Sequence, residues 1–124
     1  MPSPKFQSAF NAWLDKALSA RIPPEVIAFS FNLAEPWCIE VIGAKAYSAE
    51  DSDWACDEAF RPKIRSLDLP ESEVGTDWES VLESSKKIID AYIDRPSSGS
   101  AVLKKATAVA VGFVDGELHQ VWPR

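Results

Sequence analysis

The residues that could perform chemistry are few and widely spaced in this sequence of 124 residues. His119 is the only histidine, and the two cysteines, Cys38 and Cys56, do not form a Cys-x-x-Cys pair. A zinc site needs several imidazole or thiolate ligands close together, so the sequence predicts no metal site and no cofactor. Neither a Gly-x-Ser-x-Gly motif nor a glycine-rich phosphate loop occurs. We therefore predict no catalytic residue and interpret both cysteines as buried, reduced thiols.

Carboxylates are plentiful, and one cluster of them surrounds a tryptophan: Asp51, Asp53, Trp54, Asp57 and Glu58. Such carboxylates could hold a hard cation or act as acid and base. A calcium loop beginning at Asp51, however, would place Cys56 where the loop requires glycine. The cluster is then either a solvated acidic rim or a surface that binds a protein, and the sequence leaves both open.

The distribution of charge favours protein binding. The chain has 19 acidic and 13 basic residues, a net charge of −6. Residues 49–83 contain eleven acidic and three basic residues, whereas the rest of the chain contains eight acidic and ten basic residues. Nucleic-acid binders cluster Lys and Arg, so neither nucleic acid nor an anionic membrane is an expected partner. We predict a basic protein partner, contacted by Asp51, Asp53, Trp54, Asp57 and Glu58.

The first half of the chain predicts one helix and three strands. A helix is expected from Pro4 to Ala20, capped by Ser3, with an apolar stripe at Phe6, Phe10 and Trp13. Alternating residues predict a strand at 27–33, and a second strand follows at 37–47. We interpret 48–60 as an acidic turn and a short strand whose inward residues are Trp54, Cys56 and Phe60.

The second half predicts one helix and a hairpin. Residues 61–75 are expected to be an exposed connection. A helix follows, with a capping box at Thr76 and Glu79 and an apolar face that includes Trp78, Val81, Leu82 and Ile89. Residues 96–100 are interpreted as a flexible link. Strands at 106–114 and 117–122 then flank an Asp115–Gly116 turn.

Together these elements predict a single α+β domain over residues 1–124, in the order α-β-β-β-α-β-β. The two helices are expected to pack on a mostly antiparallel sheet of about five strands. No signal peptide or membrane span is evident near the start of the chain or beyond it, so a cytoplasmic location is expected.

Two stretches resemble a group of small bacterial proteins of unassigned function. The first runs from Phe31-Asn-Leu-Ala-Glu-Pro-Trp-Cys-Ile-Glu-Val-Ile-Gly43 to Asp53-Trp-Ala-Cys-Asp-Glu-Ala-Phe60, and the second is Ala108-Val-Ala-Val-Gly-Phe-Val-Asp-Gly-Glu-Leu118. Some proteins of this group resemble the immunity proteins of polymorphic toxin systems. The resemblance implies a small acidic cytoplasmic inhibitor that blocks a toxin, and it assigns no residue a role. A small enzyme or ligand-binding domain with a carboxylate site, and a structural subunit that forms a homodimer, remain alternatives.

Overall fold

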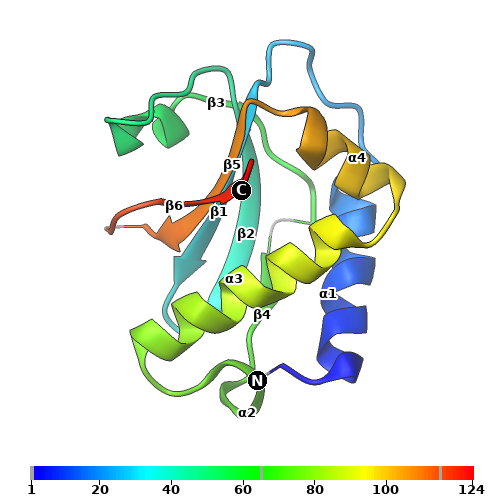
Figure 1. Ribbon diagram of the computed structural model, residues 1–124, viewed down its shortest axis with the longest axis vertical. Coiled ribbons are helices and arrows are strands. Elements are labelled where there is room, and N and C mark those ends of the chain that lie inside the picture. Colours follow the sequence, from blue (N-terminus) through cyan, green and yellow to red (C-terminus); the bar gives the residue numbers. More distant parts are fainter. Residues whose placement is uncertain (1, 65, 115) are drawn as a thin grey trace.

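A computed structural model describes residues 2–64, 66–114 and 116–124, and it shows an α+β fold with one sheet (Figure 1). The helices are α1 (Pro4–Ala17), α2 (Glu71–Val74), α3 (Trp78–Asp94) and α4 (Ser98–Lys105), with a 3₁₀ helix η1 (Ser52–Cys56). The strands are β1 (Ala28–Ala34), β2 (Cys38–Ala44), β3 (Glu58–Phe60), β4 (Ser66–Asp68), β5 (Ala108–Phe113) and β6 (His119–Trp122).

The sheet is mixed, which corrects part of the predicted topology. Its strand order is β3-β2-β1-β5-β6, and β4 also pairs with β2. The central pair, β1 and β5, is parallel, while the other pairs are antiparallel. Parallel neighbours need a long crossover, and the chain between β2 and β5, which includes α3 and α4, supplies it. Periodicity predicts that strands exist, but it does not specify which of them are neighbours.

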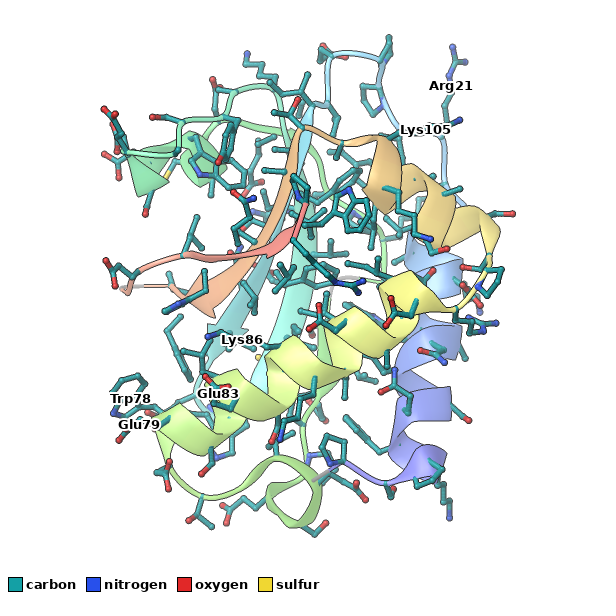
Figure 2. All side chains as sticks on the ribbon, viewed as in Figure 1. Arg21, Trp78, Glu79, Glu83, Lys86 and Lys105 are labelled. Atoms are coloured by element: carbon teal, nitrogen blue, oxygen red, sulfur yellow. The ribbon has the colours of Figure 1, made fainter. Side chains whose placement is uncertain are left out.

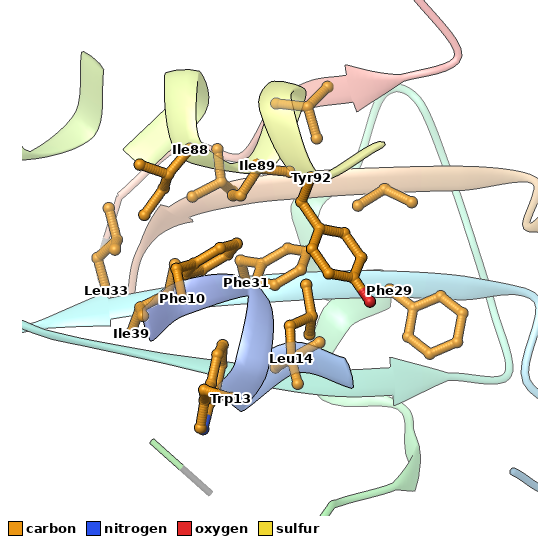
Figure 3. Packing of buried hydrophobic residues seen from close by; sticks show 14 of the residues in the cluster. Phe10, Trp13, Leu14, Phe29, Phe31, Leu33, Ile39, Ile88, Ile89 and Tyr92 are labelled. Atoms are coloured by element: carbon orange, nitrogen blue, oxygen red, sulfur yellow. The ribbon is translucent and has the colours of Figure 1, made fainter. Parts of the chain in front are cut away.

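The helices α1, α3 and α4 cover one face of this sheet and form the main core with it (Figure 3). Phe10 of α1 lies between Phe31 of β1, at 6.4 Å between ring centroids, and Tyr92 of α3, at 6.2 Å. Both predicted helix stripes are buried here, apart from exposed Trp78 at the start of the second, so their packing against the sheet is confirmed. The first helix ends at Ala17, three residues before its predicted end.

The opposite face of the sheet carries smaller side chains and is covered in part by η1. Ala28, Ala44 and Ala110 pack here with Ile42 and with Trp54 of η1. The predicted strand around residue 54 is wrong, because residues 52–56 form a 3₁₀ turn in which the Asp51 carboxylate accepts a hydrogen bond from the Asp53 N–H at 3.0 Å.

Of the three side chains predicted to face inward in this stretch, Trp54 and Phe60 are buried. Cys56 is exposed, so the interpretation of both cysteines as buried thiols is wrong for Cys56. A turn of helix does not preserve the alternation of a strand, which explains the error.

Two predicted connections contain regular structure. Residues 61–75 include β4 and α2, and Leu69 and Val74 from this stretch are buried. Residues 96–100 begin α4, where Ser97 and Ser100 form a reciprocal capping box. The antiparallel β5–β6 hairpin is confirmed. The predicted turn at Asp115, like any pairing of Arg65, lies outside the described residues.

Candidate functional site

A groove lies between α3 and the β5–β6 hairpin. Its volume is about 690 Å³, and its walls come from the first turns of α3, from the hairpin and from Glu35 in the β1–β2 turn. The residues that line it share an aromatic or charged character, apart from Leu82 and Gly116: Glu35, Trp78, Glu79, Glu83, Lys86, Phe113, Glu117 and His119. Figure 2 shows Trp78 and Glu79 at the outer end of α3, with Glu83 and Lys86 further along the helix.

The N-terminus of α3 is fixed by Asp77 and not by the predicted capping box at Thr76. The Asp77 carboxylate accepts a hydrogen bond from the Ser80 N–H at 2.8 Å, and this bond lowers the pKa of Asp77. Gly75 precedes it at φ 99°, a conformation that side-chain-bearing residues rarely adopt. The helix therefore begins at Trp78, and its spacing places residues 78, 82 and 86 along one wall of the groove.

The hairpin forms the other wall because its chain passes close to β5. Gly112 has no side chain, and the carbonyl of Glu117 occupies the space that a Cβ at position 112 would need. Alternate residues of the returning strand then face different parts of the molecule. Glu117 and His119 line the groove, whereas Leu118 packs beside Trp54 on the opposite face of the sheet. His119 is thus a half-buried residue of the groove wall.

Trp78 is the most informative residue of the groove. Its side chain is 57% exposed, which contradicts its predicted place in the core of α3. The ring packs edge-on against Phe113 with centroids 6.5 Å apart, and Phe113 in turn packs against Trp37 at 5.9 Å. The indole therefore has a neighbouring ring on one side, nearly perpendicular to it, while more than half of the residue is open to solvent.

Acidic side chains surround this aromatic surface. Glu35, Glu79, Glu83 and Glu117 are all exposed, and Lys86, the one lysine among the described residues that line the groove, pairs with Glu83 at 3.2 Å. Four carboxylates against one lysine make the groove electronegative. An aromatic face beside carboxylates attracts Lys and Arg, through the ring quadrupole as well as through charge. The groove is thus suited chemically to a basic segment that also carries apolar side chains.

The predicted acidic cluster lies on η1 and β3, and most of its members have local roles. Its four carboxylates are exposed, as a docking surface requires. Asp57 lies 3.7 Å from Lys45, and Glu58 makes a bidentate pair with Arg61, with a closest distance of 2.6 Å, that raises the pKa of Arg61.

Trp54 differs from these four neighbours. It is only 6% exposed and packs on Tyr47 with centroids 5.4 Å apart. The structure therefore brings the four carboxylates together at the surface but places the Trp54 side chain beneath them.

The described residues include no group of three or more His, Cys, Asp or Glu side chains arranged to hold a metal. Cys38 is half-buried, and its pKa is raised by burial and then by nearby Asp68 and Glu40. Within the described chain, no helix is both long and apolar enough to cross a membrane.

No protein-family model, curated protein or solved structure gives a significant match to this chain. The site must therefore be interpreted from its own geometry. The groove was missed by sequence reasoning because its residues come from three separate segments. One available signal was the position of Trp78: the first residue of a helix lies at the end of the apolar stripe, where burial is incomplete.

Proposed function

We propose that this chain is a non-enzymatic protein-binding domain that recognises a basic protein partner through the groove between α3 and the hairpin. The observation that carries the proposal is the exposed Trp78 ring, held by Phe113 and surrounded by four carboxylates. Tryptophan is enriched among the residues that dominate binding energy at protein interfaces. Here its position is fixed before binding, so little ordering of the side chain opposes association.

The two components of the groove have different roles. Burial of the exposed Trp78 ring against apolar groups supplies affinity, since removal of apolar surface from water contributes roughly 25 cal/mol per Å². A cation placed over the indole adds about 0.5–2 kcal/mol, depending on its desolvation. The carboxylates at the rim attract the basic partner at long range and so act mainly on the association rate.

The η1 segment lies on the other face of the sheet from the groove, and residues 117–119 separate the two. The strand that carries Glu117 and His119 on its groove side carries Leu118 against η1 on its other side. One partner that covers residues 117–119 therefore meets the groove and the η1 rim together. In this proposal Asp51, Asp53, Asp57 and Glu58 guide the partner, while Trp78, and not Trp54, is the tryptophan that it contacts.

The resemblance of residues 31–60 and 108–118 to immunity-like proteins suggests the class of partner. An inhibitor of this kind blocks a toxin, and a toxin with a basic surface, such as one that handles nucleic acid, has the charge that this groove attracts. Binding and masking are sufficient for such a role, and no reaction by this chain is required.

The proposal is tested by site-specific photocrosslinking in the cells that make the protein. A benzoylphenylalanine replaces Glu79 in the groove or, as a control, exposed Ala101 on α4. We expect position 79, and not position 101, to capture a protein whose contacting segment is rich in Lys and Arg.

The captured protein is then purified and titrated against two variants that each remove an exposed apolar side chain, Trp78→Ala and Ile27→Ala. We expect Trp78→Ala to weaken binding at least about tenfold, equivalent to ~1.4 kcal/mol, and Ile27→Ala to change it little. Unchanged affinity of Trp78→Ala, or capture of an acidic segment, would overturn the proposal.

A further inference from the structure

A second hollow lies at the opposite edge of the sheet from β6. It has a volume of about 560 Å³ and lies between the end of α1 with the segment after it and the residues that follow β3. Its floor is apolar and includes Ala17, Phe60 and Ile64. Strand β3 begins the strand order and β6 ends it, so this hollow and the acidic groove are on different sides of the molecule.

The charge of this hollow is the reverse of the charge of the chain as a whole. Lys16, Arg21, Arg61 and Lys63 line it, and no Asp or Glu occurs among the described residues that do so. The chain itself carries a net charge of −6. Arg61 is engaged by Glu58, which leaves three cations around an apolar floor. A ligand with carboxylates on a convex surface is the natural complement of such a hollow.

Such a surface exists on the same chain. The segment 49–57 lies at the upper left of Figure 1, where it packs on the sheet through Trp54 and exposes Glu50, Asp51 and Asp53. These carboxylates lie exposed on the surface of the segment, whereas the groove beside Trp78 is a hollow and a poor fit to a second hollow. We propose that the basic hollow of one copy binds the acidic η1 segment of a second copy, so that the chain associates with itself.

Several properties follow from this arrangement. The two surfaces differ, so each contact is heterologous, and every copy offers one η1 segment and one hollow. The charges concerned are exposed, so the attraction is screened by salt and weakens as ionic strength rises. The contact leaves the Trp78 groove open, but it covers Asp51 and Asp53, which in the proposed function guide the partner. The contact between Trp78 and that partner does not require self-association, so either proposal can fail without the other.

The test is the solution mass measured by sedimentation velocity at about 0.05 M and about 0.5 M NaCl, a range over which charge attraction is strongly screened. The wild-type chain should exceed the monomer mass at low salt and approach it at high salt. Two double variants reverse each surface, Lys16→Glu with Lys63→Glu and Glu50→Lys with Asp53→Lys. The second pair spares Asp51, whose carboxylate caps η1. Each variant alone should be monomeric.

A mixture of the two variants gives the decisive result. In the mixture, the lysines introduced on η1 of the second variant can pair with the glutamates introduced in the hollow of the first. The native η1 of the first variant can also pair with the native hollow of the second. Association should therefore return. As a matched control, Lys104→Glu with Lys105→Glu makes the same change of charge on α4 and should associate like the wild type. A monomeric wild-type chain at low salt, self-association of either reversed variant alone, or a mixture that stays monomeric would each overturn the proposal.

Discussion

Two acidic regions of this molecule each contain a tryptophan, and the structure gives the two rings opposite environments. On η1, Trp54 is 6% exposed and lies beneath the carboxylates. At the start of α3, Trp78 is 57% exposed and lies among the carboxylates. The sequence pattern predicted Trp78 in the core of its helix, which is wrong. It predicted Trp54 both as an inward residue, which is confirmed, and as a contact of the partner. Trp54 therefore holds its segment in place, whereas Trp78 is available to a partner.

The difference arises from what lies next to each ring. The sheet face beside η1 is built from small side chains, Ala28, Ala44 and Ala110, which leave room for a large one. Trp54 fills that room and so anchors a segment that is otherwise polar. Beside Trp78 lies the ring of Phe113, and this neighbour leaves Trp78 57% exposed. A large residue is buried where its neighbours are small enough to admit it.

The largest expected effect is on stability at Trp54. Trp54→Ala removes a buried aromatic side chain and should lower the free energy of unfolding by about 3–5 kcal/mol. Trp78→Ala, at an exposed position, should lower it by less than about 1 kcal/mol. Urea denaturation of both variants measures the two values. Similar losses in the two variants would show that the contrast between the two rings does not exist.

Residues with a strong, sustained period were predictable from sequence. The stripes of α1 and α3 depend on local spacing that burial of one face requires. The alternation of large and small side chains identified β1, although residues 28–31 are buried on both faces of the sheet. The short elements were not, because η1, α2 and the start of α4 depend on single hydrogen bonds and contacts. The composition of residues 96–100 predicted a flexible link. In the structure Gly99 lies in α4 against the Tyr92 hydroxyl, where a Cβ would not fit.

The candidate site was predictable only in part. The acidic character of residues 49–83 was evident, and two of the groove carboxylates, Glu79 and Glu83, belong to that segment. The groove itself depends on the placement of α3 beside the β5–β6 hairpin. That placement depends in turn on the parallel pairing of β5 with β1. No local pattern reports such non-local packing, so the groove could not be inferred. Only the position of Trp78 at the end of the apolar stripe indicated that its burial would be incomplete.

A smaller effect on stability is expected when the residues that cap the helices of the two regions are replaced. Asp77 caps α3 at 2.8 Å and Asp51 caps η1 at 3.0 Å. Asp77→Ala should lower the melting temperature more than Asp51→Ala, since α3 has 17 residues and η1 has five. The lowered pKa of Asp77 means that its contribution is present above the ordinary carboxyl pKa and is lost as pH falls through the folded-state value.

Melting curves of Asp77→Ala and the wild type should therefore converge as pH falls below about 4, the ordinary range of an aspartate. Asp77→Asn serves as a control, because an amide oxygen can accept the same hydrogen bond without titrating. If the melting temperature of the wild type stays above that of Asp77→Ala by the same amount in acid, the Asp77 carboxylate is not the stabilising group.

The smallest effect on stability is expected from the η1 carboxylates. Asp51→Asn, Asp53→Asn, Asp57→Asn and Glu58→Gln together should leave the fold intact, since exposed ion pairs contribute less than about 1 kcal/mol each. The same variant should bind the captured partner more slowly and with a flatter dependence on salt. A thermal melt and association rates at two ionic strengths measure both properties. Collapse of the fold would instead make these carboxylates structural, and unchanged rates would make them a solvated rim.

The most direct test of the account is which tryptophan responds to a basic ligand. The chain has five tryptophans, and their indole N–H groups give separate signals in a ¹⁵N-labelled sample once each is assigned by substitution. The probe is the amphipathic peptide acetyl-Arg-Leu-Arg-Leu-Arg-amide, with a Glu-for-Arg peptide as the control. The account predicts that the basic peptide shifts the Trp78 indole signal and leaves that of Trp54 unchanged, and that the acidic peptide shifts neither. A basic peptide that shifts the Trp54 signal, or that leaves the Trp78 signal in place, would contradict it.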